Sequence, residues 1–354
     1  MEKRVLMKGN EAIAEAAIRA GCRYYFGYPI TPQTEIMHYM AKRMVEVGGT
    51  VIQAESELAA INMVYGAAAA GARAMTSSSS PGISLKQEGF SYIAGAELPA
   101  VVANIVRAGP GLGGILPSQG DYFQATKGGG HGDYRNIVLA PASVQELYEM
   151  TIEAFNLADR YRMLALILGD GALGQMMEPV VFRDKEPIDL PKKPWAVTGT
   201  GGVRPHNTIT SIYIKADVLE AFNRKLQAKY AEVSRREVRA ECLNCEDADI
   251  LMVAFGTCSR IGRGIIPIAA AQGVRVGLIR PITLWPFPSD VIARAAAQPS
   301  VKAVLTIELS CGQMVEDVRL AVDGMKPIAF LGRSGGNLPT QKEILQKIMK
   351  MVGR

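Results

Sequence analysis

Two polar clusters stand directly after strand-like hydrophobic runs near the start of the chain, where they could carry chemistry. The first is Tyr28-Pro29-Ile30-Thr31-Pro32, and the second is Glu55-Ser56-Glu57. Glu57 opens an alanine-rich apolar segment, so its carboxyl group would be largely removed from water. A carboxyl in such a setting can share a proton with a weakly basic ring nitrogen. Taken alone, Thr31 could equally cap a helix, and a helix dipole would favour either acid at its start.

Two more polar segments follow later strand-like runs. The turn Thr76-Ser77-Ser78-Ser79-Ser80-Pro81-Gly82 offers hydroxyl and amide groups ahead of another predicted helix, which suits an anion or a polar ring. Arg107 ends an apolar strand just before the glycine-rich stretch 108–114. Arginine is a planar two-pronged donor for a carboxylate, although a structural ion pair explains Arg107 equally well by itself. Because ligands gather at the carboxyl ends of parallel strands, four such loops together favour a functional site.

The elements that would position these residues alternate between strands and helices. This alternation predicts a parallel sheet covered by helices on both faces. The predicted strands span 24–27, 50–53, 73–76, 100–106, 137–140 and 163–168, and the predicted helices span 10–19, 33–47, 56–70 and 143–158.

The pattern changes between residues 183 and 249. Prolines at 187, 191 and 194, the glycine-rich run 198–202 and a charged helix over 217–240 indicate a connecting segment. We therefore predict an α/β domain over 1–182, a connecting segment over 183–249 and a smaller α/β domain over 250–354. In the last domain we expect strands at 250–255, 274–278, 303–307 and 328–331, and helices at 259–272, 289–297 and 314–322.

Composition narrows the class of protein. The 354 residues carry a net charge of only +5, with Lys and Arg scattered, so nucleic-acid binding is not expected. No run approaches the roughly 20 apolar residues that cross a bilayer, and no signal peptide is recognisable, so a cytoplasmic location is expected. Five cysteines are an odd number, which argues against a disulfide framework. The pair Cys242 and Cys245 lacks further ligands for a zinc or iron–sulfur site, and we expect ordinary thiols.

Taken together, these motifs resemble the alpha subunit of the 2-oxoacid:ferredoxin oxidoreductases. The resemblance rests on Tyr28–Pro32, on Glu57 with the helix after it, on the Ser-Pro-Gly turn and on Arg107 before its glycine loop. It extends over the whole chain, because residues 280–288 and 308–313 are similar to the transketolase C-terminal domain found in that family. Within the family, the chain is most similar to the branched-chain subgroup, which acts on 3-methyl-2-oxobutanoate.

The resemblance implies an enzyme that cleaves a 2-oxoacid with thiamine diphosphate, reduces ferredoxin and transfers the acyl group to coenzyme A. It implies that the first domain is a pyrimidine-type thiamine diphosphate-binding domain, in which Glu57, rather than Glu55, contacts the aminopyrimidine ring. Pro29 and Ser80 are the other expected cofactor contacts. Thr31 and Arg107 are expected to bind the substrate, with Arg107 holding its carboxylate.

The resemblance also implies partner subunits. The run Gly169-Asp170-Gly171 looks like the start of a diphosphate and magnesium motif, but the stretch 196–201 lacks the asparagines that this motif requires. We interpret the run as a turn at a strand end and expect no metal ligand in this chain. A beta subunit would then hold the diphosphate and Mg²⁺, next to a gamma subunit and a ferredoxin-like delta subunit, and iron–sulfur clusters would belong to partners.

Substrate choice has two candidate answers. A branched aliphatic acid needs only apolar room, which the loop 109–116 could supply. The alternative substrate, 2-oxoglutarate, needs a second cation, and Lys86, Lys127 or Arg135 could provide it. Lys86 could equally be a solvated lysine. His131 in its glycine-rich loop could be a proton shuttle or a coenzyme A contact, but it is more simply a loop histidine.

Two rival functions stay open at the level of sequence. One is a thiamine-dependent decarboxylase or dehydrogenase without ferredoxin chemistry, which would have a partner chain without iron–sulfur cysteines. The other is a non-catalytic assembly subunit, in which Glu57 is only an acid at the start of a helix.

Overall fold

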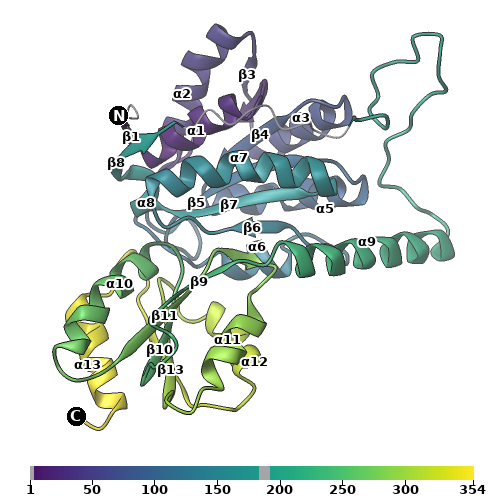
Figure 1. The fold of residues 1–354 in the computed structure, drawn as a ribbon. Coiled ribbons are helices and arrows are strands. Elements are labelled where there is room, and N and C mark those ends of the chain that lie inside the picture. The colour runs from purple at the N-terminus through teal and green to yellow at the C-terminus, as the bar shows by residue number, and fades with distance from the viewer. Residues whose placement is uncertain (1–3, 183–191) are drawn as a thin grey trace.

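The computed structural model describes residues 4–182 and 192–354 and contains two main β-sheets flanked by helices (Figure 1). The larger sheet has seven strands in the order β12-β6-β7-β5-β4-β2-β3. All of its strands run parallel except β12, which pairs antiparallel with β6. The strands are β2 Tyr24–Gly27, β3 Thr50–Gln53, β4 Ala74–Ser78, β5 Ala100–Val106, β6 Ile137–Leu139, β7 Leu164–Asp170 and β12 Thr283–Trp285.

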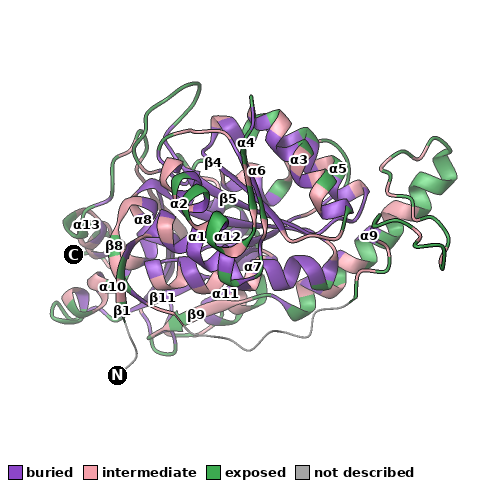
Figure 2. Cartoon of the chain, turned by 90° about the horizontal axis from the view of Figure 1, so that it is seen from above, coloured by how far each residue is buried: buried purple, intermediate pink, exposed green. Residues whose placement is uncertain are grey.

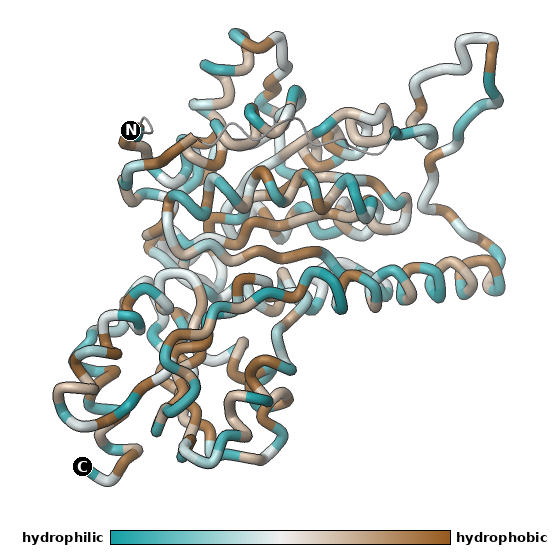
Figure 3. Tube along the Cα trace, in the orientation of Figure 1, coloured by the Kyte–Doolittle hydropathy of each residue, from teal (hydrophilic) through white to brown (hydrophobic). Residues whose placement is uncertain are grey.

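The centre of this sheet is apolar on both faces. Every residue of β5 and β7 is buried, as expected for parallel strands covered by helices on both sides, and Figure 3 shows hydrophobic strands through the middle of the molecule. Helix α1 (Gly9–Arg19) packs against α7 (Val144–Tyr161), and α3 (Glu57–Ala69) packs against α5 (Gln87–Gly95). Shorter elements complete this part: α2 Thr34–Met44, a 3-10 turn Val45–Val47, α4 Pro81–Leu85, α6 Tyr122–Lys127, α8 Gly171–Gln175 and the antiparallel pair β1 Arg4–Lys8 and β8 Met177–Val181.

The smaller sheet has five strands in the order β14-β13-β10-β11-β9. Only β9 runs antiparallel, and it pairs with β11. The strands are β9 Ala240–Leu243, β10 Ile250–Val253, β11 Val276–Pro281, β13 Ala303–Glu308 and β14 Ile328–Gly332, and the helices are α10 Gly256–Ala270, α11 Ser289–Ala296, α12 Met314–Val322 and α13 Gln341–Met351. The predicted α/β fold with parallel sheets is therefore confirmed.

Four strands were not predicted from the sequence, namely β1, β8, β9 and β12. The charged helix expected over 217–240 is α9, Ala216–Arg236, and residues after it form β9 in the smaller sheet. Strand β12 is only three residues long and joins the larger sheet from within the predicted C-terminal domain. The predicted division into 1–182, 183–249 and 250–354 stays a prediction, and its first boundary lies, with Pro187 and Pro191, outside the described residues.

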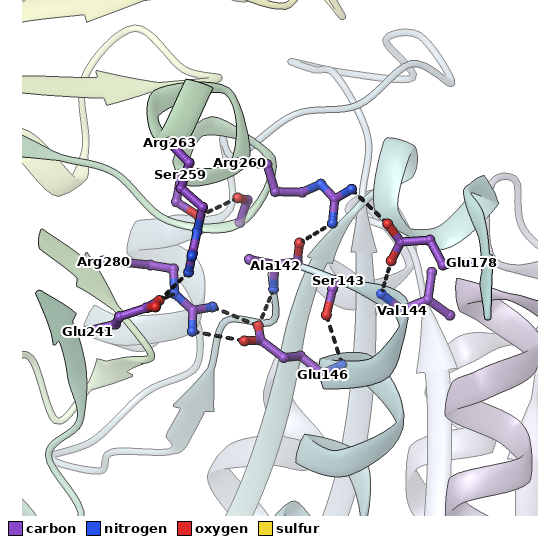
Figure 4. A network of polar contacts seen from close by, with 11 residues as sticks. Ala142, Ser143, Val144, Glu146, Glu178, Glu241, Ser259, Arg260, Arg263 and Arg280 are labelled. Atoms are coloured by element: carbon purple, nitrogen blue, oxygen red, sulfur yellow. Dashed lines mark hydrogen bonds and ion pairs between the residues drawn. The ribbon is translucent and has the colours of Figure 1, made fainter. Parts of the chain in front are cut away.

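A buried arginine joins the two sheets (Figure 4). Arg280 of β11 donates two bonds to the Glu146 carboxylate, at 2.6 and 2.9 Å, and a third to Glu241 at 2.9 Å. Arg260 of α10 binds Glu178 at 2.7 Å and the carbonyl of Ala142 at 2.8 Å. The smaller sheet is thereby fixed against the start of α7. Helix α9, by contrast, extends away from both sheets and is largely exposed (Figure 2).

Candidate functional site

The predicted site residues lie after neighbouring parallel strands of the larger sheet. Thr31 follows β2, Glu57 follows β3, Ser80 follows β4 and Arg107 follows β5. These four strands are adjacent in the order β5-β4-β2-β3, so their carboxyl ends meet at one edge of the sheet. Contacts between the loops described below bring the four residues into one region.

Glu57 is the first residue of α3, where the Ser56 hydroxyl caps the helix by accepting a bond from the Ala59 amide at 3.1 Å. Glu57 is only 6% exposed. Its carboxylate makes no hydrogen bond or ion pair with a described residue, although it attracts the buried Lys86 ammonium electrostatically. It lies over Gly82, where an added Cβ would stand 2.5 Å from its Oε1 atom. Because Gly82 has no side chain, the Glu57 carboxylate can occupy this space.

The serine turn after β4 presents unpartnered hydroxyl groups beside Glu57. The Oγ atoms of Ser78 and Ser79 are buried and have no hydrogen-bond partner among the described residues. An added Cβ at Gly82 would also lie 2.0 Å from the Ser78 Oγ atom, which places this hydroxyl close to the Glu57 carboxylate. Buried polar atoms normally have partners, so these hydroxyls are available to a ligand or to another chain.

Ser80 links this turn to Arg107. Its amide donates to the side chain of Asn104 at 3.2 Å, and its hydroxyl accepts from the Arg107 amide at 3.0 Å. Ser80 has a φ of 24°, a conformation that side chains rarely adopt. Such backbone strain gathers at functional sites when the surrounding contacts hold it in place.

Arg107 has a buried guanidinium without a carboxylate partner in the described chain. It donates to the carbonyls of Thr31 and Leu112, each at 3.0 Å, and its Nε atom is buried and unpaired. The structural ion pair considered as an alternative for Arg107 is therefore not found among the described residues. The alternative for Thr31 is wrong as well, because Gln33 occupies the cap position and α2 begins at Thr34. Thr31 itself is exposed, and Pro29 beside it is half-buried.

A cavity of about 350 Å³ opens beside Arg107, between loops of the two sheets. Asp121 lines it and accepts a bond from Asn104 at 2.8 Å, and burial raises the pKa of this carboxyl. The sequence analysis did not identify Asp121 and Asn104 as site residues. The residues around Asp121 carry no signal that this loop carboxyl becomes buried. The lining is otherwise formed mainly by small and hydroxyl side chains, among them Ser80, Ser84, Ser118, Ser310, Cys311 and Ser334.

The three lysine and arginine residues considered for a second cation do not line this cavity. Lys86 is fully buried rather than solvated, donates to the Glu57 carbonyl at 3.1 Å, and has its pKa lowered to about 8 by desolvation. Lys127 pairs with Asp317 of α12. Arg135 and His131 line other cavities.

Asp170, at the end of β7, has a structural role as a helix cap. Its carboxylate accepts bonds from the amides of Ala172 at 2.9 Å and Leu173 at 3.2 Å, and so caps α8. The run Gly169-Asp170-Gly171 lies at a strand end as expected, but it passes from β7 directly into α8 instead of forming a turn. Cys242 and Cys245 are free thiols, and within residues 4–182 and 192–354 no group of three or more His, Cys, Asp or Glu is placed to hold a metal ion.

No described helix has the length and hydrophobicity needed to cross a bilayer.

Two family models and several relatives match the chain. The model for the thiamine diphosphate-binding part of pyruvate flavodoxin/ferredoxin oxidoreductase matches residues 15–241, and the model for pyruvate:ferredoxin oxidoreductase core domain II matches residues 248–344. Ketoisovalerate oxidoreductase subunit VorB of Methanothermobacter thermautotrophicus is 52% identical over 98% of both chains. 2-Oxoglutarate synthase subunit KorA of the same organism is 36% identical over 99% of this chain and 100% of its own.

Solved structures of known proteins also resemble this chain. The 2-oxoglutarate:ferredoxin oxidoreductase of Magnetococcus marinus, solved with 2-oxoglutarate, coenzyme A and succinyl-CoA, superposes with a TM-score of 0.86 and 26% identity. The match covers 99% of this chain and 66% of that one. A split-gene transketolase at 12% identity and a TM-score of 0.60 shares the fold alone. This chain therefore belongs to the pyruvate flavodoxin/ferredoxin oxidoreductase family, as an alpha-type subunit of a 2-oxoacid:ferredoxin oxidoreductase.

Proposed function

We propose that this chain is the alpha subunit of an enzyme that oxidatively decarboxylates 3-methyl-2-oxobutanoate to its acyl-CoA and CO₂ while reducing ferredoxin. The names of the VorB relatives, at 51% and 52% identity, support the branched-chain substrate over 2-oxoglutarate, since the KorA relatives share only 36% to 39%. The observation that carries the proposal is the buried Arg107 guanidinium, which has no carboxylate partner among the described residues, at the same edge of the sheet as Glu57.

The residues at the strand ends fit thiamine diphosphate. Glu57 offers an unpaired carboxylate, Ser78 and Ser79 offer buried hydroxyls without partners, and Gly82 keeps the space between them open. Thiamine diphosphate, when bound, supplies the nucleophilic carbon that decarboxylation of a 2-oxoacid requires. Glu57 would hold a proton shared with the aminopyrimidine ring, while Pro29 and Ser80 would contact the cofactor from either side.

Arg107 and Thr31 would bind the substrate. The guanidinium is held rigidly by the Thr31 and Leu112 carbonyls, which leaves its remaining N–H groups to bind a carboxylate. The Thr31 carbonyl contacts the guanidinium, and the Thr31 hydroxyl would donate to the 2-oxo group. Rigid placement of both donors orients the acid for reaction.

A partner subunit would complete the site. Helix α3 has an almost continuously apolar sequence, as buried helices do, yet Leu58 on it is 44% exposed and Met63 and Tyr65 are half-buried. This supports a beta subunit that covers α3 and holds the diphosphate and Mg²⁺. Gamma and ferredoxin-like delta subunits would carry the electrons, with the iron–sulfur clusters outside this chain.

The charge of the cavity favours the branched acid. Arg107 is the single cationic side chain in the described lining, and a dicarboxylic 2-oxoglutarate would require a second. The neighbouring Asp121 adds a carboxyl group, which would repel a distal carboxylate when ionised.

Purification of the complex through a tag on this chain tests the proposal. Coenzyme A-dependent reduction of a low-potential dye should be faster with 3-methyl-2-oxobutanoate than with 2-oxoglutarate. A preference for 2-oxoglutarate would contradict the substrate assignment but leave Glu57, Thr31 and Arg107 in place. Absence of reduction with either acid would favour the non-catalytic alternative.

A further inference from the structure

Asp121 stands at the N-terminal cap of α6 but does not cap this helix. Aspartate at such a position usually accepts a hydrogen bond from one of the first amides of the helix. Here the side chain accepts no such bond. It binds strand β5 instead, where it accepts a bond from the Asn104 side chain at 2.8 Å, and it lines the cavity beside Arg107. Helix capping therefore does not explain this half-buried carboxylate.

Asn104 is a buried amide in the middle of an apolar strand. The other residues of β5 are alanine, valine and isoleucine, and Asn104 is only 1% exposed. Its Nδ2 atom donates to Asp121, and its Oδ1 atom accepts a bond from the Ser80 amide at 3.2 Å. Because an ionised carboxylate only accepts hydrogen bonds, Asp121 determines which end of the amide faces it. The oxygen of Asn104 is thereby directed at Ser80.

Ser80 connects Asn104 to the backbone of Arg107. Its φ of 24° is strained, and the bond from its amide to Asn104 helps to hold that conformation. Its hydroxyl accepts a bond from the Arg107 amide at 3.0 Å and donates to the Arg107 carbonyl at 3.2 Å. An unbroken chain of hydrogen bonds therefore runs from the Asp121 carboxylate to the backbone of Arg107.

We propose, on the basis of the proposed function, that Asp121 is a positioning residue, which acts through the amide of Asn104 to hold Arg107 where it binds the carboxylate of the 2-oxoacid. Without the carboxylate of Asp121, the Asn104 amide can rotate and turn its NH₂ group toward the Ser80 amide, which cannot accept a hydrogen bond. The strained turn then loses a bond that holds it, and the backbone of Arg107 is released with the Ser80 hydroxyl. Affinity for the acid falls, because donors that are fixed in advance bind a carboxylate more tightly than mobile ones.

Steady-state kinetics of the purified complex test this role. Asp121→Asn keeps the shape of the side chain but offers both a donor and an acceptor, so it no longer fixes the Asn104 amide. The KM for 3-methyl-2-oxobutanoate should rise roughly tenfold, the usual effect of one lost hydrogen bond to a charged group, while kcat changes much less. Removal of a negative charge would by itself lower the KM of an anionic acid, so a rise reports lost positioning. Asp290→Asn is the matched control, since Asp290 is exposed in the first turn of α11 and does not line the cavity.

A double variant restores the chain of hydrogen bonds. When Asp121→Asn is combined with Asn104→Asp, the carboxylate and the amide exchange places. The carboxylate on β5 can then accept bonds from the Ser80 amide and from the new amide on the loop, so both bonds are preserved. The KM for the 2-oxoacid should return close to that of the unmodified complex.

The outcomes separate this inference from the proposed function. If the unmodified complex turns over the branched acid and its KM stays equal or falls in Asp121→Asn, the inference is wrong and the proposed function stands. A double variant with a KM no lower than that of Asp121→Asn would also overturn the inference, because Asp121 would then act on the substrate directly. Failure of Asp121→Asn to assemble would overturn it as well, since the carboxylate would then be needed for folding. A complex that turns over no 2-oxoacid before any substitution contradicts the proposed function itself.

Discussion

Arg107 and Glu57 are the two residues on which the functional account depends. Buried charged side chains are normally paired, because burying an isolated charge costs several kcal/mol. Arg107 is only 7% exposed and bonds backbone carbonyls alone, and Glu57 has no polar contact to its carboxylate within the described chain. Such residues are poor contributors to folding, and their unused bonding capacity is available to the proposed ligands.

Glu57→Gln should reduce turnover of the complex by several orders of magnitude, because a glutamine cannot share a proton with the cofactor ring. Thermal stability should hardly change, since the carboxylate makes no bond within the described chain. Glu55→Gln is the matched control, because Glu55 is exposed two residues away. Steady-state rates of the unmodified complex and of the two variants check this. Equal rates for both variants would refute the role of Glu57.

Arg107→Ala should raise the KM for the 2-oxoacid by roughly thirtyfold, the equivalent of about 2 kcal/mol for hydrogen bonds to a charged group. Arg107→Lys should recover only part of this, because lysine lacks the planar fork. The KM for coenzyme A should stay nearly constant in both variants. An unchanged KM for the 2-oxoacid in Arg107→Ala would exclude carboxylate binding at this residue.

Helix α4 and the serine turn before it shape the space around Glu57. Gly82→Ala should lower cofactor affinity and activity strongly, because the added methyl would collide with the Glu57 carboxylate and the Ser78 hydroxyl. Gly262→Ala on α10 is the control, since its added Cβ would make ordinary contacts at 3.6 Å. Titration of thiamine diphosphate into each apo complex distinguishes the two. Equal affinity in both variants would contradict the proposed cofactor position.

Lys86, which follows α4, makes stability depend on pH. Burial lowers its pKa from 10.5 to about 8, so between these values the unfolded chain binds a proton that the folded chain does not. Stability should therefore rise with pH through this window, by up to about 3 kcal/mol, relative to Lys86→Met. Denaturant midpoints of both proteins between about pH 7 and pH 10 check this. Parallel curves would show that Lys86 titrates normally.

The local sequence predicted the bounds of helices and strands far better than it predicted which side chains are buried. Strands 24–27, 50–53 and 100–106 and helix 314–322 match the structure to the residue, because hydrophobic periodicity and turn residues are local signals. Strands β1, β8, β9 and β12 were missed, since each is short and defined by pairing with distant residues. Likewise, the sequence indicated Glu57 and Arg107, but the burial of Lys86 and Asp121 arises only from tertiary packing.

At the scale of the whole molecule, Arg280 fixes the smaller sheet against the larger one. Arg280→Met should destabilise the chain by roughly 2 to 3 kcal/mol, below the loss for a fully buried pair, because Glu146 and Glu241 keep some exposure. Arg275→Met should change stability much less than Arg280→Met, since the pair with Asp249 is exposed on the arginine side. Unfolding midpoints compare the two, and equal effects would show that the sheets are held together by other contacts.

We propose that this chain selects a branched 2-oxoacid at a site which a partner subunit completes. A competition experiment tests it most directly: the purified complex receives equal concentrations of 3-methyl-2-oxobutanoate and 2-oxoglutarate, with coenzyme A and an electron acceptor, and the two acyl-CoA products are quantified. The ratio of initial products equals the ratio of kcat/KM for the two acids. We predict a large excess of 2-methylpropanoyl-CoA, whereas an excess of succinyl-CoA would show that the enzyme prefers 2-oxoglutarate.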